Sequence, residues 1–315
     1  MCKVGSTMAT KNDFKLNLQD LFEEYAWRRF NDTRNVFSRM FNRRSKFYID
    51  VRWGYIEFKH ETTRFEERPD VVDVTPAEIS VSEVSDVKGS PKASKDVILY
   101  QSDYENRTPM DQEYNFSSTR DTTNSTTVEL QENYTKGGEC SLEISVPGDL
   151  VTVGAGLSGS LSVTKTETET FETTTSWTVD TKINVRKGHR AEAKVHVSER
   201  NSVADFEVKT TMKVIDGKEL LIAIRRVSDD KLVHIVGVPD LLDVFYKLVE
   251  TNPNVEKLEY LDKSRSTPRK RHKVILYSRG TCKSMSWKNQ HVEVHSERIP
   301  SYSYEEDEST KDDKQ

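Results

Sequence analysis

Seven histidines are the residues of this chain best suited to bind a metal ion or to transfer protons. They are His60, His189, His196, His234, His272, His291 and His295. None of these histidines has the spacing of zinc ligands. His291 and His295 are the nearest pair, but the Val-Glu-Val between them alternates in a way that is typical of a strand rather than a helix. We therefore expect no metal and no cofactor.

A glycine-rich run at Gly154–Gly159 is the next candidate for chemistry. It lacks the Lys-Ser/Thr pair of a phosphate loop, and Gly156-Leu157-Ser158-Gly159 misses the spacing of a nucleophile elbow. No Ser/His/Asp or Cys/His arrangement stands out. The sequence therefore predicts a protein that is not an enzyme.

The pattern with the clearest physical consequence is Ser141–Thr164, which alternates about a turn at Pro147, Gly148 and Asp149. One face is apolar: Leu142, Ile144, Val146, Val151, Val153, Ala155, Leu157, Leu161 and Val163. The other face carries small hydroxyl groups and one carboxylate: Ser141, Glu143, Ser145, Thr152, Ser158, Ser160, Ser162 and Thr164. Because successive strand residues point to opposite faces, the pattern predicts a two-faced β-hairpin.

Length bears on what such a hairpin could do. Val151–Val163 is longer than the usual globular strand of about 5–6 residues. It fits a tilted membrane-crossing strand, which needs roughly 9–11 residues. The two faces could therefore be the lipid and lumen sides of a transmembrane β-barrel, or the inner and outer sides of a half-buried soluble hairpin.

Composition favours a β-protein with much surface per residue. The 315 residues are 34% hydrophobic, and their mean hydropathy is −0.72. Aromatic residues are nevertheless plentiful, with 12 Phe, 12 Tyr and 4 Trp, which argues against wholesale disorder. The net charge of −5 argues against general nucleic-acid binding.

The cysteines and the targeting and glycosylation signals restrict the interpretation less than the composition does. Three cysteines, Cys2, Cys140 and Cys282, permit at most one disulfide. We expect no signal peptide, because the amino terminus lacks an apolar stretch, and no transmembrane helix. Five Asn-x-Ser/Thr sequons occur in regions rich in these residues, which favours chance over glycosylation: Asn31, Asn106, Asn115, Asn124 and Asn133.

The chain divides into four predicted regions. Residues 1–95 form an amino-terminal lobe, helical over Asn12–Arg44 and strand-like over Phe47–Phe58. Residues 96–236 are a succession of long β segments that contains the hairpin. Residues 237–300 hold a short helix at Pro239–Val249, a basic linker at Ser264–Lys273 and further strands. Residues 301–315 are a disordered acidic tail.

A polar β stretch, the alternating hairpin, and a Trp-led strand with its return strand follow one another in this order. Together they resemble the aerolysin-like β-pore-forming proteins of the epsilon-toxin/mosquitocidal-toxin branch. The matching stretch is about Val97–Val236, and the Ser176–Gly188 segment corresponds to the family's Ser/Thr-rich run into a Trp strand and turn. Arg186 and Lys187 stand where the family commonly has two prolines.

The resemblance implies a mainly β (α+β) architecture: an elongated aerolysin-like fold of long twisted antiparallel strands with a helical amino-terminal lobe. It also implies that monomers bind a membrane lipid or a membrane receptor and form a homo-oligomeric ring, in related toxins often a heptamer. The hairpins would then zip into one barrel, with the apolar face toward lipid and the polar face lining the pore. Glu143, the one charge in the spanning strands, predicts a mild cation preference.

Two further groups of residues carry alternative interpretations. Arg269, Lys270 and Arg271 could be cleaved by a trypsin-like protease to activate the protein, or could be a solvated loop. Tyr25, Trp27, Trp53 and Tyr55 could form a receptor surface, although such residues are more often the core of a lobe.

The function that we predict is therefore a toxin-like, cytolytic pore that conducts ions and serves host defence. The alternative is a non-lytic receptor- or vesicle-binding protein on the same scaffold. The soluble form would be cytoplasmic, or secreted without a recognisable signal peptide, and the active form would sit at a target membrane.

Overall fold

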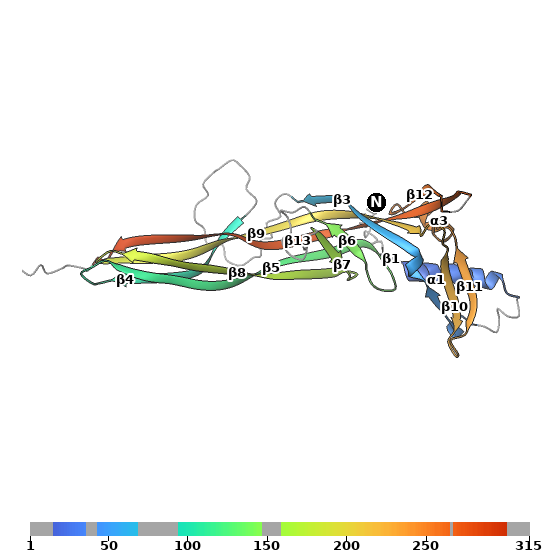
Figure 1. Ribbon diagram of the computed structural model, residues 1–315, viewed down its shortest axis with the longest axis horizontal. Coiled ribbons are helices and arrows are strands. Elements are labelled where there is room, and N and C mark those ends of the chain that lie inside the picture. Colours follow the sequence, from blue (N-terminus) through green and yellow to red (C-terminus); the bar gives the residue numbers. More distant parts are fainter. Residues whose placement is uncertain (1–14, 36–42, 69–93, 147–158, 265–266, 301–315) are drawn as a thin grey trace, which may run out of the picture. The chain divides into compact units, whose positions relative to one another are not determined.

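The computed structural model describes residues 15–35, 43–68, 94–146, 159–264 and 267–300. Within these residues the protein is mainly β-sheet, as predicted, with two α-helices (Figure 1). The chain forms two compact units. Unit 1 comprises residues 1–71, 126–171 and 202–284, and unit 2 comprises residues 72–125, 172–201 and 285–315. The predicted regions follow sequence order, whereas these units interleave, because strand pairing joins segments that are far apart in the chain.

The longest strands contribute to both units. They are β5 (Gln112–Thr135), β8 (Thr168–Val185), β9 (His189–Val214) and β13 (Arg269–Arg298). Together with β1 (Lys15–Asn17), β3 (Ile56–Glu67), β4 (Ser94–Asn106) and β12 (Val255–Asp262) they form an eight-stranded sheet. Its main order is β1-β5-β13-β9-β3, while β12 pairs with β13, β4 with β9, and β8 with β5.

Unit 1 contains the helix α1 (Leu18–Asp32), whose first turn is capped by Asn17. The Asn17 side chain accepts a hydrogen bond from the backbone N–H of Gln19 at 3.0 Å, which satisfies one of the free donors at a helix start. The helix is shorter than the predicted Asn12–Arg44 span. Residues 15–17 instead pair in parallel with β5, so tertiary pairing overrides the local helical pattern there.

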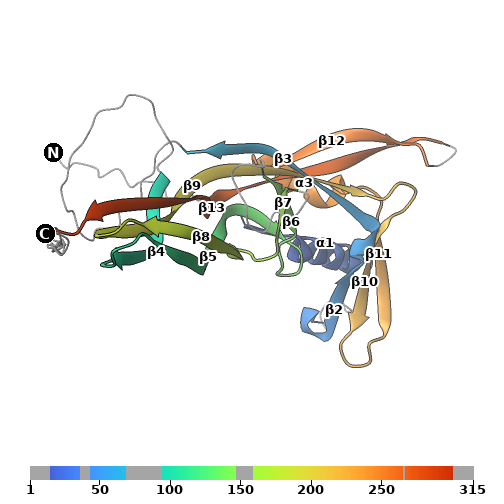
Figure 2. The same ribbon diagram turned by 60° about the vertical axis from the view of Figure 1, so that its left-hand side comes forward.

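A three-stranded sheet packs beside α1 in unit 1. It consists of β2 (Phe47–Val51), β10 (Leu220–Arg226) and β11 (Leu232–Val238), in the order β11-β10-β2 (Figure 2). The short helices η1 (Arg44–Lys46) and η2 (Trp53–Tyr55) flank β2. Residues of the inner face of this sheet, such as Ile222 and Ile224, are fully buried and share a hydrophobic core with Phe22 of α1.

The carboxy-terminal part of unit 1 contains α3 (Leu242–Thr251), which realises the predicted helix at Pro239–Val249, and the β12–β13 pair. Asp240 links them, because one of its carboxylate oxygens accepts from the backbone N–H of Leu242 at 3.0 Å and the other lies 2.9 Å from His272 Nδ1. These contacts place α3 against the buried apolar side of the sheet, where Phe245 is fully enclosed.

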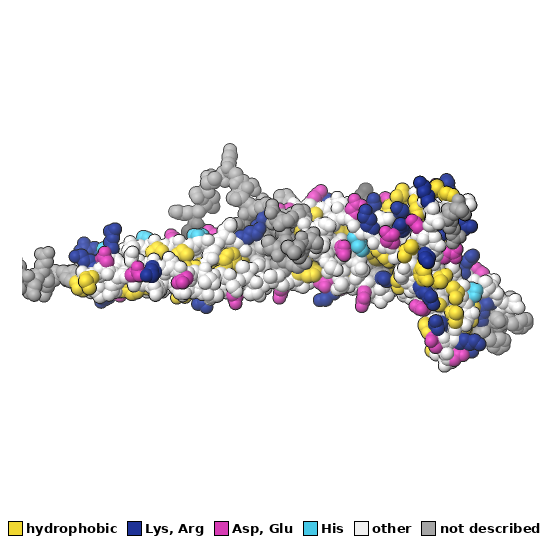
Figure 3. All heavy atoms as spheres, viewed as in Figure 1, with side chains coloured by type: hydrophobic (Ala, Val, Ile, Leu, Met, Phe, Trp, Pro, Cys, Tyr) yellow, Lys and Arg dark blue, Asp and Glu magenta, His cyan; other side chains and the backbone are white. Residues whose placement is uncertain are grey.

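Unit 2 is built from β4 and from the parts of β5, β8, β9 and β13 that lie in it. β4 pairs antiparallel with β9, from Ser94 opposite Arg200 to Asn106 opposite His189. Its core is an aromatic and aliphatic cluster that includes Phe116, Val185 and Val195. Charged side chains of both signs are distributed over the face that Figure 3 shows.

Candidate functional site

The candidate site is the hairpin made by β6 (Leu142–Ser145) and β7 (Ser160–Val163) in unit 1. The two strands pair antiparallel, with Leu142 opposite Val163 and Ile144 opposite Leu161. Backbone bonds continue the pairing at both ends, from Val146 N to Gly159 O at 2.7 Å and from Cys140 N to Thr164 O at 3.0 Å. β6 and β7 form a two-stranded sheet of their own, distinct from the eight-stranded sheet.

The two faces of the hairpin differ as the alternation predicts. The apolar residues are buried, with exposures from 0% to 7%: Leu142, Ile144, Val146, Leu161 and Val163. Ser141, Glu143, Ser145, Ser162 and Thr164 are exposed, and Ser160 is half-buried. In this state the face that was predicted to meet lipid is turned into the protein.

The apolar face packs on a surface that we call the seat. The seat is formed by Val128 and Leu130 of β5, Phe206 and Val208 of β9, and Cys282 of β13, with Phe65 of β3 and Phe171 of β8 at its border. Gly280 of β13 leaves no room for a side chain here, because a Cβ at this position would collide with the backbone oxygen of Glu129 on β5 and would lie 2.6 Å from the ring of Phe206 on β9. The seat, with its border, thus replaces water with apolar side chains from five strands of the large sheet.

β3 holds one edge of the hairpin through polar contacts. The backbone N–H of Ser145 donates to Thr62 Oγ1 at 2.7 Å. Two residues earlier on β3, His60 Nδ1 lies 3.1 Å from Thr210 Oγ1, a hydroxyl group that is fully buried. Burial lowers the pKa of His60, and the nearby negative charge of Glu143 on β6 partly opposes this shift.

The segment that enters the hairpin is a tight turn fixed to β5. Gly137 and Gly138 adopt φ of 67° and 95°, which side chains disfavour, and Lys136 N donates to Glu139 O at 2.8 Å. The hydroxyl group of Tyr134 donates to Ser141 O at 3.0 Å. Tyr134 itself is 1% exposed, so this anchor at the base of β6 belongs to the core.

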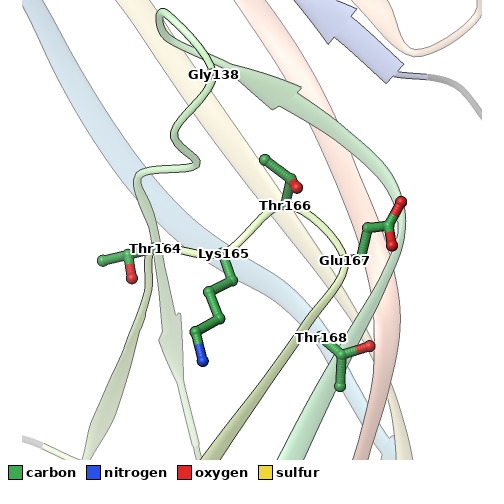
Figure 4. Close-up of a pocket in the computed structure, with 6 residues that line it drawn as sticks. All are labelled: Gly138, Thr164, Lys165, Thr166, Glu167 and Thr168. Carbon is green, nitrogen blue, oxygen red and sulfur yellow. The ribbon is translucent and has the colours of Figure 1, made fainter.

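The segment that leaves the hairpin is held by the carboxylate of Glu169. It accepts hydrogen bonds from the backbone N–H groups of Thr164 at 2.6 Å and Lys165 at 3.1 Å, and from the Thr164 hydroxyl group at 3.2 Å. Burial alone would raise the pKa of Glu169, but these hydrogen bonds outweigh it and lower the pKa. The same segment, Thr164–Thr168, lines an open pocket of about 430 Å³ next to Gly138 (Figure 4).

Two cysteines lie in the hydrophobic cluster beneath the hairpin. Cys140 precedes β6 and Cys282 lies on β13, and both are buried and unpaired as thiols. Burial raises the pKa of Cys140 to about 11 and that of Cys282 to about 12. Both thiols are therefore protonated at neutral pH and pack as small apolar groups.

The central part of the predicted spanning segment lies outside the described residues. This holds for the predicted tip, Pro147, Gly148 and Asp149, and for six residues of the two faces: Val151, Thr152, Val153, Ala155, Leu157 and Ser158. The structure therefore describes the base of the hairpin and its seat.

The predicted cleavage residues lie in a strand rather than in a loop. Arg269, Lys270 and Arg271 begin β13 and pair with Asp262, Leu261 and Tyr260 of β12. The Arg271 side chain is 5% exposed, lies 3.3 Å from the Asp262 carboxylate and donates to Lys218 O at 3.0 Å. A protease needs an extended, accessible segment, so cleavage here would require β13 to detach first.

The predicted receptor residues belong largely to the core of unit 1. Tyr25 is 8% exposed and lies in the hydrophobic cluster, and Trp27, Trp53 and Tyr55 are half-buried against it. Trp53 packs edge-on against Phe22, with 5.5 Å between the ring centroids. Trp27, Trp53 and Tyr55 thus keep part of their surface in water.

Sequence reasoning did not identify the residues that hold the hairpin in place. Thr62, His60, Tyr134 and Glu169 are ordinary members of strands with many similar neighbours. Glu169, for example, lies in a Thr-Glu repeat in which only the fold decides which carboxylate faces the hairpin base. No local signal could have separated it from Glu167.

Two negative findings concern the described residues only. No group of three or more His, Cys, Asp or Glu side chains among them is arranged to hold a metal ion. None of the helices in this part of the chain is long and apolar enough to span a bilayer.

Comparison with known proteins gives structural likenesses at low sequence identity. No family model matches the chain, and neither does any curated protein. Among solved structures, the chain is similar to the Cry23Aa1 and Cry37Aa1 binary protein complex, with 16% identity, a TM-score of 0.47 and 91% of each chain covered. It is also similar to a non-toxic crystal protein from Bacillus thuringiensis, with 16% identity, a TM-score of 0.45, and 92% of this chain and 100% of that chain covered.

A third similar structure is the Mpp75Aa1.1 β-pore-forming protein from Brevibacillus laterosporus, with 14% identity, a TM-score of 0.41 and 90% of each chain covered. One of these three similar structures is thus described as a β-pore-forming protein. At these identities none of them distinguishes the epsilon-toxin/mosquitocidal-toxin branch from its neighbours.

Proposed function

We propose that this protein forms pores: it binds a membrane as a soluble monomer, assembles with further copies, and inserts residues 141–164 of each copy into one β-barrel. The observation that supports this most is the β6–β7 hairpin. It is a separate two-stranded sheet that keeps a fully apolar face against the seat and a polar face toward water. Such an element can leave without breaking the pairing of the large sheet.

Energetics explain why the hairpin stays docked in water. Its five buried apolar side chains each gain about 1.5–3 kcal/mol from burial, so exposing all five to water would cost about 8–15 kcal/mol. Lipid hydrocarbon offers these side chains an equivalent apolar surrounding. Moving the hairpin off the seat is therefore unfavourable in water and close to neutral in free energy at a bilayer. The hairpin is thus expected to leave the seat only at a membrane.

Backbone hydrogen bonding explains why copies must assemble. A hairpin alone in lipid leaves the outer edges of both strands unpaired, and each unsatisfied group costs several kcal/mol. Pairing with hairpins of neighbouring copies removes these edges by closing a barrel. In that barrel Leu142, Ile144 and Leu161 would face lipid, and the exposed residues such as Glu143 and Ser162 would line the pore.

A reversible cross-link between the hairpin and β3 tests this function. Thr62 and Ser145 are suited to it, because Thr62 Oγ1 accepts from the Ser145 backbone at 2.7 Å. We expect the Thr62→Cys/Ser145→Cys variant to release no dye from liposomes or red cells when oxidised. Reduction should restore release together with an SDS-resistant oligomer.

The matched control places the cross-link inside the hairpin. Ser145 and Ser160 are opposite one another in the β6–β7 register, so a Ser145→Cys/Ser160→Cys disulfide leaves the hairpin free to move as a unit. This variant should release dye in both redox states. Membrane binding without release, unaffected by the β3 cross-link, would contradict pore formation and indicate the non-lytic binding protein.

A further inference from the structure

Lys136 lies where the large sheet passes into the hairpin. It follows β5 directly, and β6 begins at Leu142. Gly137 and Gly138 come next, with φ of 67° and 95°, and the backbone N–H of Lys136 donates to Glu139 O at 2.8 Å. Two consecutive glycines can change their backbone angles at little steric cost. Lys136 is therefore the residue on the sheet side of the point about which the hairpin entry can bend.

The ammonium group of Lys136 lies over two aromatic rings, Trp53 and Phe58, which we call the aromatic pair. Its Nζ atom is 5.2 Å from the ring centroid of Trp53 and 5.6 Å from that of Phe58. Both distances are within the range of about 6 Å over which a cation is attracted to the face of a ring. Among the residues that the structure describes, Lys136 forms no ion pair, so no carboxylate there competes with the rings for its charge.

Buried neighbours hold the aromatic pair in place. Trp53 packs edge-on against Phe22 of α1, with 5.5 Å between the ring centroids. Phe58 of β3 stacks on Tyr134 of β5, with 6.4 Å between the centroids and 12° between the planes. Phe22 and Tyr134 are 0% and 1% exposed. The aromatic pair, whose own centroids are 6.5 Å apart, therefore has a fixed geometry that belongs to the core of unit 1.

The alternation at the end of β5 explains why Lys136 reaches these rings. Tyr134 and Lys136 are two positions apart, so both side chains leave the chain on the same side, and both contact Phe58. Tyr134 also donates its hydroxyl hydrogen to Ser141 O at 3.0 Å. One face of the chain thus carries two contacts at the hairpin entry, a hydrogen bond to the hairpin and a cation–π contact to the aromatic pair.

We propose that Lys136 restrains the entry of the hairpin: its ammonium group, held over the aromatic pair, fixes the sheet side of the Lys136–Glu139 turn and keeps that turn closed. This inference rests on the proposed function and assigns a positioning residue to the step in which the hairpin leaves the seat. Loss of the contact would let Gly137 and Gly138 move together with the hairpin. The hairpin entry should then open more often, both in solution and at a membrane.

Hydrogen exchange and dye release together test the restraint in the full-length protein. Lys136→Met removes the charge and keeps an unbranched side chain. The backbone N–H groups of Cys140 and Val146 report on opening, because they donate across the hairpin to Thr164 O and Gly159 O. In solution we expect them to exchange about three- to tenfold faster than in the wild type, the factor that a half-buried cation–π contact supplies. Dye release should become faster by a similar factor.

Two further variants examine the cation–π contact itself. Lys136→Arg keeps a cation that also stacks on aromatic faces, so it should exchange and release dye at wild-type rates. Trp53→Leu removes one ring of the aromatic pair. In that background Lys136→Met should have a smaller effect than in the wild type, because part of the contact is already lost. Additive effects of the two changes would contradict the inference.

Lys273 provides a matched control, because it makes a similar contact elsewhere in unit 1. Its Nζ atom lies 5.2 Å from the ring centroid of Tyr260, on the β12–β13 pair, and Lys273 is half-buried like Lys136. Lys273→Met should leave hairpin exchange and dye release unchanged. Unaltered circular dichroism would show that each variant is folded. Equal acceleration by Lys273→Met, or wild-type exchange in Lys136→Met, would overturn the inference.

The two measurements separate this inference from pore formation. Faster hairpin exchange in Lys136→Met, with no dye release by any variant on any membrane, would support the restraint and contradict the pore. Dye release that is blocked by the Thr62–Ser145 cross-link, with the same hairpin exchange in Lys136→Met and the wild type, would support the pore and contradict the restraint.

Discussion

Three asparagines of Asn-x-Ser/Thr sequons are used inside the protein. Asn106 donates its amide to Val185 O and Met110 O, both at 2.8 Å, and is fully buried. Asn124 donates to Thr175 Oγ1 at 2.8 Å and Asn133 to Thr166 O at 2.7 Å. A glycan on any of these nitrogens would remove the hydrogen bond and could not fit, so their role at the residue scale is to hold strands together.

His60 gives the docked hairpin a dependence on pH. Burial holds its pKa below the ordinary value, so the docked state binds a proton more weakly than a state in which His60 reaches water. The docked state is therefore unaffected above the ordinary histidine pKa and is disfavoured as the pH falls below it. Glu143 of β6 opposes this effect, and Thr210 of β9 supplies only a neutral hydroxyl group.

We expect dye release to become faster as the pH falls from about 7.5 to about 5, the range in which an exposed histidine gains its proton. His60→Asn should flatten this profile, because the replacement does not titrate. His295→Asn is the control, since His295 is an exposed histidine at the far end of β13. Identical pH profiles for the wild type and His60→Asn would exclude His60 as the sensor.

At the scale of elements, the two ends of the hairpin are held in different ways. The entry relies on a buried phenol, with the Tyr134 hydroxyl group on Ser141 O. The exit relies on an accessible carboxylate, with Glu169 accepting from the backbone of Thr164 and Lys165. An exit held by charge-assisted hydrogen bonds near water is the weaker end, because solvent can compete for the same groups.

Glu169→Gln should loosen the exit of the hairpin. The amide keeps the shape and one acceptor but loses the charge, at a cost of about 1–2 kcal/mol. We expect roughly tenfold faster dye release and faster trypsin cleavage at Lys165 in solution. The lowered pKa of Glu169 agrees with this expectation. The carboxylate contributes to the stability of the docked hairpin above the ordinary carboxyl pKa, and this contribution is lost as the pH falls through the pKa of Glu169 in the folded protein.

Glu167→Gln is the control for this prediction. Glu167 lies two residues away on the same segment and pairs with Lys15 at 3.1 Å, with both side chains largely exposed. Such a pair contributes little to stability, so its removal should change neither rate. Equal behaviour of the two variants would show that the Glu169 hydrogen bonds do not restrain the hairpin.

The strand that contains Arg269–Arg271 determines how accessible the predicted cleavage residues are to a protease. Asp262 accepts from the Ser264 hydroxyl group at 2.5 Å, from Ser264 N at 3.0 Å and from Gly217 N at 3.1 Å, and it pairs with Arg271. These hydrogen bonds lower the pKa of Asp262 to about 2, so the carboxylate is charged throughout the physiological range. The basic run that the sequence offers to a protease thus includes an arginine that joins β12, β13 and the turn before β10.

At the scale of the whole molecule, the assembled pore would repeat one carboxylate per copy. Glu143 lies on the exposed face of β6 and is the one charged residue of the described hairpin strands. A ring of such carboxylates inside a barrel attracts cations and repels anions.

We expect channels in planar bilayers to show a reversal potential of mild cation preference under a KCl gradient. Glu143→Gln should remove the preference, and Glu143→Lys should reverse it. Glu139→Gln, outside the paired strands, should change nothing. A reversal potential that is the same in all four proteins would place Glu143 outside the pore lumen and contradict the proposed lining.

Much of the fold follows from patterns along the chain. Period-two alternation predicted long strands and the two faces of the hairpin, because each strand residue has its direction set by its immediate neighbours. The same reasoning located α3, whose apolar stripe has helical spacing. It overestimated the first helix, since the pairing of residues 15–17 with β5 depends on a segment more than a hundred residues away.

The sequence by itself determined that residues 141–164 have one apolar and one hydrophilic face. Only the tertiary structure decided that the apolar face rests on Val128, Phe206 and Cys282, and that Thr62 and Glu169 hold it there. It also decided that Arg271 is buried, that three sequon asparagines are internal, and that Leu232 and Ile235 are left exposed. The physical reason is that alternation is a local property, whereas burial and hydrogen bonding depend on which distant strands become neighbours.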